Sequence, residues 1–170
     1  MRALTFTLIA LALAAPAAAQ TADRLPDGWA FGATVGRFTI EDVRLVSTSI
    51  HITRLSHNRI TPEFTMGFFP QYFDEGGVWL TPDLGLAANV SLPKATLLVK
   101  GGVSGVFAFG QGGGGALPGV HVGTGLLIQV IPGLGLRLEA LYHRYLFEFN
   151  PDYGVGAWTF GIGISSLPKR

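Results

Sequence analysis

The stretch Val78–Leu92, VWLTPDLGLAANVSL, decides the fold. Residues two apart in a β-strand lie on the same face, and in this stretch the two faces differ in character. One face collects the apolar residues Val78, Leu80, Leu84, Leu86, Ala88, Val90 and Leu92, whereas the other collects Thr81, Asp83, Gly85, Asn89 and Ser91. Such a strand is suited to separate an apolar environment from a packed polar interior.

The same alternation recurs along the chain in segments separated by turn residues, at a length that suits strands of roughly ten residues. In the fifth segment Leu98 and Val106 depart from it, because they are apolar residues on the polar side. We expect eight strands, at about 29–40, 43–55, 59–72, 78–92, 95–109, 117–131, 134–148 and 155–166.

The composition indicates a membrane protein that crosses the bilayer with strands. Mean hydropathy is +0.40, only 14% of the residues are charged, and 24 are glycine, which is unlike an ordinary soluble domain. After the first residues no long unbroken apolar segment follows. In lipid, the backbone N–H and C=O groups must then find their hydrogen-bond partners within a closed sheet. The predicted fold is an all-β, eight-stranded antiparallel up-and-down transmembrane β-barrel over residues 29–170.

The N-terminal residues predict export. Arg2, the apolar run Leu4–Ala14 and the small residues Ala17–Ala19 form a signal-peptide pattern, because the run is too short to span a bilayer. We expect residues 1–19 to be cleaved and 20–28 to form a short periplasmic leader. The expected location is the outer membrane of a Gram-negative-type cell. There is no cysteine, and a net charge of +1 argues against nucleic acid as a partner.

A soluble lipocalin-like barrel is the competing interpretation, since it also alternates but turns its apolar face inward around a ligand. Its outer face would be rich in Lys and Glu. Here the polar face is mostly Gly, Ala, Ser and Thr, which favours the membrane barrel.

The connections are predicted to alternate between tight periplasmic turns and longer external loops. The tight turns are Ser56–Asn58, Leu92–Lys94 and Ile131–Gly133. The expected external loops are Thr39–Asp42, Asp74–Gly77, Gly110–Ala116 and Asn150–Gly154. The glycines at 112–115 lack the Lys-Ser/Thr of a phosphate-binding loop, so they are interpreted as a flexible loop.

Together the export signal, the eight alternating strands, turns such as Leu92–Lys94 and the final strand Trp158–Ile164 resemble the small OmpA-like and OmpX-like, porin-like outer-membrane barrels. The chain departs from them where it continues through Leu167–Arg170, since such barrels commonly end on an aromatic residue. The resemblance implies a monomer with a structural or surface-interaction role in the cell envelope. Its implied partners are outer-membrane lipids, lipopolysaccharide and the barrel assembly machinery.

Five charged residues fall on the predicted lumen face: Glu63, Asp83, Lys100, Arg137 and Glu139. Charges that face a narrow interior must pair or stay hydrated. An eight-stranded barrel has room only for its own side chains, so we expect an ion-pair network that plugs the lumen. The alternative is a narrow porin-like channel in which these residues set ion selectivity.

Three histidines, His51, His121 and His143, also point inward by parity. Histidines with carboxylates can bind metal or act as bases, but none of these pairs sits at ligand spacing within a strand. We expect hydrogen-bonded interior histidines, with no metal and no cofactor.

An enzymatic alternative rests on a resemblance to the eight-stranded outer-membrane lipid A deacylases, which carry a histidine, a serine two residues later and a downstream glutamate. His143–Tyr145 followed by Asn150–Asp152 is similar in position. Tyr145 stands where the serine nucleophile belongs, and no glutamate follows in the final strand, so acyl transfer lacks its nucleophile. The chain is therefore not expected to be an enzyme.

Three arginines are candidates for a contact with lipopolysaccharide. Arg37, Arg44 and Arg144 are predicted to face outward near the external ends of neighbouring strands. The planar guanidinium suits phosphate. The alternative is that they are boundary charges that extend to water.

Overall fold

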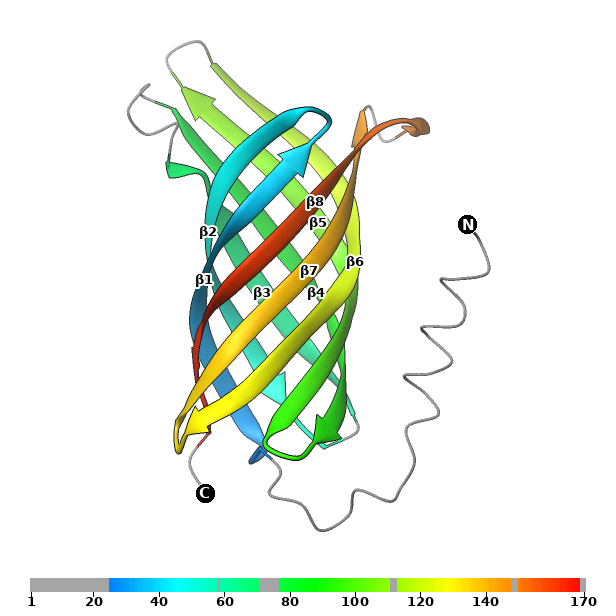
Figure 1. Ribbon diagram of the computed structural model, residues 1–170. Coiled ribbons are helices and arrows are strands. Elements are labelled where there is room, and N and C mark those ends of the chain that lie inside the picture. The colour runs from blue at the N-terminus through cyan, green and yellow to red at the C-terminus, as the bar shows by residue number, and fades with distance from the viewer. Residues whose placement is uncertain (1–24, 58, 71–76, 111–112, 148–149, 169–170) are drawn as a thin grey trace.

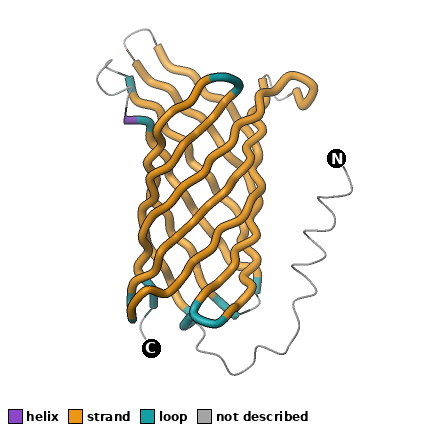
Figure 2. The backbone as a smooth tube through the Cα atoms, viewed as in Figure 1, coloured by secondary structure: helices purple, strands orange, loops and turns teal. Residues whose placement is uncertain are grey.

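The chain forms one closed barrel of eight antiparallel strands. The computed structural model describes residues 25–57, 59–70, 77–110, 113–147 and 150–168. Each strand pairs with the next in sequence, and the last pairs with the first, so the described sheet is closed (Figures 1 and 2). The strands are β1 Gly28–Ile40, β2 Val43–Leu55, β3 Ile60–Phe68, β4 Val78–Leu92, β5 Ala95–Gly110, β6 Gly113–Ile131, β7 Leu134–Phe147 and β8 Asn150–Ser166.

Both described ends of the chain, near residues 25 and 168, lie at the same end of the barrel, which we call the terminal end (Figure 1). The opposite end is the distal end. No helix in the described residues is long and apolar enough to cross a membrane. The predicted signal peptide, most of the leader and residues 169–170 lie outside the described residues.

The predicted strands agree with the structure to within one residue at the terminal end and differ more at the distal end. β2 and β4 have the predicted bounds, and the turn after β1 contains only Glu41 and Asp42. β3 was expected to reach residue 72 but ends at Phe68, and residues 71–76 lie outside the described part. The hydrophobic pattern therefore located the strands better than it located their ends.

Two predicted external loops are wrong because they are strand. In the first, Gly110–Ala116, the described residues belong to paired strands, since pairing between β5 and β6 continues from Phe107↔Ala116 to Gly110↔Gly113. The second, Asn150–Gly154, begins β8, where Gly154 pairs with Leu146. Glycine-rich sequence has low strand propensity on its own, but a continuing partner strand supplies the hydrogen bonds that hold it extended.

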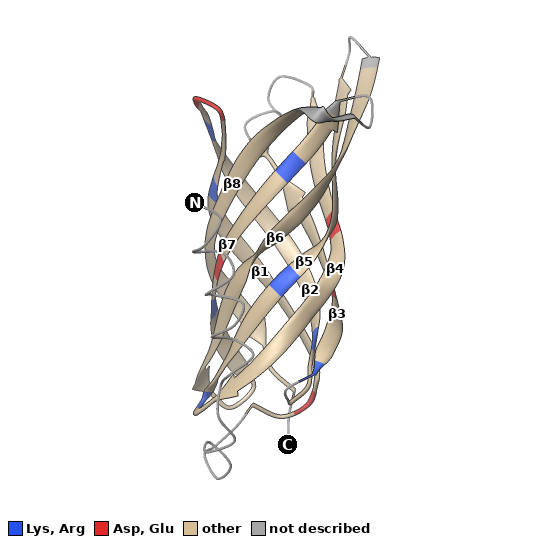
Figure 3. Cartoon of the chain, turned by 90° about the vertical axis from the view of Figure 1, so that its right-hand side faces the viewer, with Lys and Arg blue, Asp and Glu red and all other residues tan. Residues whose placement is uncertain are grey.

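The outer face of the wall is apolar. Val46, Leu84, Val103, Phe160 and Ile164 are among the large hydrophobic side chains that point away from the lumen and are more than half exposed. Figure 3 shows that charged residues are sparse along the wall. A lipocalin-like barrel would carry the reverse pattern, so the fold is a transmembrane barrel with lipid-facing strands.

Apolar clusters lie at both ends of the lumen. The terminal cluster contains Leu25, Ala30, Leu55, Ala87, Leu98, Leu127 and Leu167, and the distal cluster contains Phe38, Phe69, Val106, Tyr145 and Ala157. Leu98 and Val106, which broke the alternation of the fifth segment, belong to these clusters. Leu167 extends the chain beyond β8 in order to pack here, and its N–H donates to the Gly133 carbonyl at 2.9 Å.

A polar contact also holds the entry to β1 at the terminal end. The Asp27 carboxylate accepts hydrogen bonds from the backbone N–H and the ring of His57, which follows β2. Slight burial acts to raise the pKa of Asp27, but the hydrogen bonds and charge of His57 outweigh it and hold that pKa below its ordinary value. The described end of the leader is therefore attached to the barrel.

Candidate functional site: the charged lumen

Four of the five predicted lumen charges meet in one ring halfway down the barrel. Arg137 Nη2 lies 2.8 Å from Glu63 Oε1 and 2.7 Å from Glu139 Oε1. Lys100 Nζ contacts the same two carboxylates. Each cation therefore touches both anions, and the two charges of each sign cancel. We call these four side chains the ion-pair ring.

The ring is almost completely removed from solvent. Arg137 has no exposed surface, and Lys100, Glu63 and Glu139 retain 4%, 7% and 9% of theirs. Thr53 completes the arrangement, because its hydroxyl donates to Glu63 Oε2 at 2.8 Å and accepts from Arg137 Nη1 at 2.9 Å. Buried charges of this kind are tolerated only when they are paired and hydrogen-bonded.

Strand parity and register place these groups together. Glu63 comes from β3, Lys100 from β5, and Arg137 and Glu139 from successive inward positions of β7. The strands lie on different sides of a narrow lumen, so long side chains can meet at its axis. Sequence parity predicted the inward direction, but only the register shows that they meet at one level.

Asp83 lies outside the ring, contrary to the prediction. Its Oδ1 is 3.8 Å from His121 Nδ1 and 3.7 Å from His143 Nδ1, nearer the distal end. Ser104 joins this second layer, with its hydroxyl 3.1 Å from His121 Nδ1 and 3.4 Å from His143 Nδ1. We call these four residues the histidine layer. Asp83 Oδ1 has no hydrogen-bond partner in the described residues.

Ser104 is a site residue that the sequence pattern does not reveal. Strand parity with Lys100 puts Ser104 on the inward face of β5, but serine is common on that face and nothing in the strand singles it out. Only the pairings Asp83↔Ser104 and His121↔His143 bring the four side chains to one level. The remaining predicted histidine, His51, lies 3.3 Å from the Ser165 hydroxyl through Nε2.

The histidine layer combines a hydroxyl, imidazoles and a carboxylate, which are the groups that acyl transfer uses. The cavities beside it have volumes of about 30 and 10 Å³. These spaces hold about a water molecule and leave no room for an ester substrate. In the described residues no group of three or more His, Asp or Glu side chains is arranged to hold a metal ion.

The residues that resemble a deacylase site also point into the lumen. His143 and Tyr145 are 2% and 0% exposed, and their rings stack at 5.7 Å. The Thr159 hydroxyl lies 3.2 Å from His143 Nε2. The side chains of Asn150–Asp152 lie outside the described part of the structure.

The three predicted arginines lie on the outer face near the distal end. The side chains of Arg37 and Arg44 are exposed, and that of Arg144 is partly exposed. In each strand the residue that follows the arginine points into the lumen. They belong to β1, β2 and β7, and only β8 separates β7 from β1. Arg37 pairs with Phe160 of β8 and Arg144 with Gly156 of β8. We call them the arginine arc.

Comparison with solved structures finds the same architecture. The neisserial surface protein A, NspA, has a TM-score of 0.57 and 13% sequence identity, covering 81% of this chain and 94% of its own. A major outer membrane protein from Thermus thermophilus has a TM-score of 0.53 and 10% identity, covering 84% and 99%. The outer membrane enzyme PagL has a TM-score of 0.49 and 13% identity, covering 81% and 98%.

A scan against protein-family models finds no match, and a search among curated proteins finds no relative. Identities this low show a shared fold only, so activity has to be argued from the side chains. The fold and its lipid-facing wall define the class: the chain is a small eight-stranded β-barrel of the outer-membrane type.

Proposed function

We propose that this protein is a non-conducting, non-enzymatic barrel of the outer membrane, with a structural or surface-interaction role in the cell envelope. The observation that carries the proposal is the ion-pair ring. Four charges with no net sum fill the lumen at mid-height, and Arg137 has no exposed surface. An ion would have to break these contacts in order to pass.

The apolar clusters support the same proposal. The terminal cluster lies below the ring and the distal cluster lies above the histidine layer, so the ring is enclosed between two apolar layers. Hydrophobic constrictions oppose the passage of ions because they do not replace the hydration shell. In this proposal the terminal end faces the periplasm and the distal end faces the outside, as in an exported barrel with an even number of strands.

The proposal is tested by planar-bilayer recording on folded wild-type protein. We expect no stable current at either polarity. The matched variant is Lys100→Ala/Glu139→Ala, which removes one charge of each sign and leaves the Glu63–Arg137 pair, so it should leak more than the wild type. Steady wild-type openings whose ion selectivity changes in Arg137→Gln would establish the channel instead.

The non-enzymatic part of the proposal rests on the small cavities beside the histidine layer. No acyl chains should be released when purified protein is incubated with lipid A in mixed micelles. Release that is abolished by Ser104→Ala would reverse this conclusion, because Ser104 is the hydroxyl that lies against the imidazoles.

The surface-interaction part of the proposal assigns the arginine arc to lipopolysaccharide. The arc lies near the distal end on the outer face, where lipid phosphates would stand at the edge of the hydrocarbon. Guanidinium groups bind phosphate through paired hydrogen bonds.

A further inference from the structure

The ladder between β4 and β5 is interrupted at one place. Pairing runs from Val78↔Phe109 to Leu80↔Phe107 and resumes at Asp83↔Ser104. The intervening residues of β4 are Thr81 and Pro82, and proline has no N–H to donate. The register is the same on both sides of the gap, so the interruption is a local loss of pairing and not a slip of the strand.

Gly105 lies at this gap between two prolines. The register places it opposite Pro82 on β4, and it pairs with Pro118 on β6. Gly105 adds no side chain of its own to the outer face, and the ring of Phe107 lies over it, 2.9 Å from where a Cβ of Gly105 would stand. We call this part of the wall the β4–β5 seam, defined by Thr81, Pro82, Gly105 and Val106.

An apolar groove of about 460 Å³ covers the seam on the outside. Its walls include Leu84 and Val103, each 59% exposed on the lipid-facing surface, together with Phe107 and the two prolines. In a bilayer this face meets the hydrocarbon, so the groove presents an apolar surface to lipid acyl chains.

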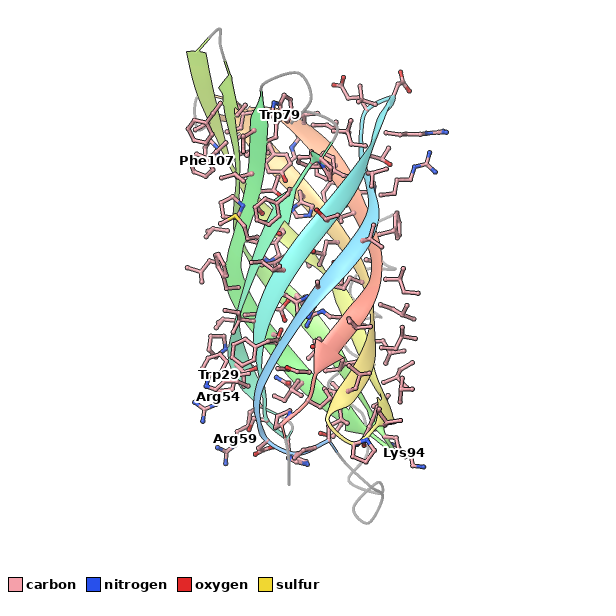
Figure 4. All side chains as sticks on the ribbon, turned by 90° about the vertical axis from the view of Figure 1, so that its left-hand side faces the viewer. Trp29, Arg54, Arg59, Trp79, Lys94 and Phe107 are labelled. Atoms are coloured by element: carbon pink, nitrogen blue, oxygen red, sulfur yellow. The ribbon has the colours of Figure 1, made fainter. Side chains whose placement is uncertain are left out.

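An apolar chamber of about 320 Å³ lies inside the barrel at the distal end. Its lining includes Phe38, Phe69, Trp79, Val106, Leu117 and Tyr145. The rings of Phe38 and Phe69 meet edge to face, with centroids 5.0 Å apart. Both rings also border the cavity of about 30 Å³ beside the histidine layer, so they separate the chamber from the lumen charges. Figure 4 shows Trp79 and Phe107 at this end of the barrel.

The groove and the chamber lie on the two sides of the wall beside the seam and share one lining residue. Leu117 lines both, and Val106 of the chamber follows Gly105 directly in the chain. Glu41, which is exposed, is the one charged residue among the described walls of either space. The chamber has the size of a small-molecule site and offers its occupant almost entirely apolar contact.

We propose that the chamber takes up one hydrocarbon chain of a membrane lipid, which enters from the bilayer through the β4–β5 seam. Paired strands separate most easily where hydrogen bonds between them are missing, and here both sides of the gap are already apolar. The occupant is a lipid chain because the outer side of the seam faces hydrocarbon and the walls of the chamber are almost entirely apolar. This inference goes beyond the structural role and does not depend on whether the lumen conducts.

The test uses Trp79 as a reporter inside the chamber. Trp29 and Trp158 lie on the lipid face, 48% and 49% exposed, and are replaced by phenylalanine so that only Trp79 emits. The protein is reconstituted in phosphatidylcholine vesicles whose acyl chains are either unmodified or dibrominated. Entry of a brominated chain should lower Trp79 emission relative to the unmodified vesicles.

The seam is then locked after folding. Because the chain has no cysteine, Thr81→Cys/Val106→Cys introduces one pair across the gap and keeps Pro82 and Gly105, and its oxidation closes the seam. The matched control is Val90→Cys/Leu97→Cys, on the same two strands where the ladder is complete. Reduced protein of each variant serves as its own folding control.

We expect the quenching to be lost when the seam pair is oxidised, to return on reduction, and to stay unchanged when the control pair is oxidised. Equal Trp79 emission in the two kinds of vesicle would overturn the proposal. So would quenching that is indifferent to oxidation of the seam, because the chain would then act from the groove outside. Loss of quenching in the oxidised control as well would point to a general tightening of the wall and would equally contradict the route.

Discussion

At the scale of single residues, Arg137 is the side chain on which the interior depends most. It is fully buried, it contacts two carboxylates and Thr53, and its Nε has no hydrogen-bond partner in the described residues. Removing one partner of a buried ion pair costs about 3–5 kcal/mol, because it leaves an uncompensated charge. Removing a charge of each sign leaves a balanced pair and costs less.

Arg137→Met should therefore lower the free energy of unfolding by about 3–5 kcal/mol, measured by equilibrium urea unfolding in phospholipid vesicles. In Arg137→Met/Glu139→Gln the remaining Lys100 and Glu63 are balanced, so this double variant should be more stable than the sum of the two single changes by about 0.5–3 kcal/mol. Strictly additive effects would show that the ring is four independent side chains. The matched single variant Glu139→Gln completes the cycle.

At the scale of strands, closure depends on close approach where β1 meets β8. Gly163 pairs with Thr34, and a Cβ added to Gly163 would lie 1.9 Å from the Ala33 carbonyl oxygen and 2.6 Å from Thr34 Cα. Both are backbone atoms that cannot move without parting the strands. A glycine here thus allows the last strand to pair closely with the first.

Gly163→Ala should destabilise the barrel by about 1–3 kcal/mol, as overpacking does, and reduce the heat-modifiable folded band on cold gels. Gly115→Ala is the control, because an added Cβ at Gly115 meets nothing within 4 Å, and it should change stability by less than about 0.5 kcal/mol. If both variants fold and unfold alike, close packing at the β1–β8 junction is unimportant.

The strands also show what sequence can and cannot predict. Period-two alternation predicted each strand and its inward face, because parity is a local property of the backbone. It failed at Gly110–Ala116 and Asn150–Gly154, where pairing with a neighbouring strand overrides poor propensity. It also could not separate Asp83 from the ring or add Ser104 to the histidine layer, since levels along the barrel depend on register between strands.

At the scale of the whole molecule, the two ends of the barrel carry different groups of cations. Arg37, Arg44 and Arg144 lie near the distal end, whereas Arg54, Arg59 and Lys94 lie at the terminal end, as Figure 4 shows for the second group. Both groups are on or beside the outer surface. Side chains that merely extend their charged heads to water would account for either group equally well. A specific contact with lipopolysaccharide would distinguish them, because that lipid presents its phosphates only on the outer side.

Alanine substitution of each group of cations compares the two ends directly. Replacing the arginine arc, Arg37, Arg44 and Arg144, by alanine should reduce the lipopolysaccharide retained through purification and lower the melting temperature in lipopolysaccharide-containing micelles, with little change in plain detergent. Replacing Arg54, Arg59 and Lys94 by alanine removes as many charges from the terminal end and should change neither quantity. If any surface cation could hold lipopolysaccharide, retention and melting temperature would fall equally in the two triple variants. A general effect of charge does not depend on the end of the barrel at which the charge lies. Unchanged retention and stability in the arc variant would assign its arginines to the ordinary boundary charges of a membrane barrel.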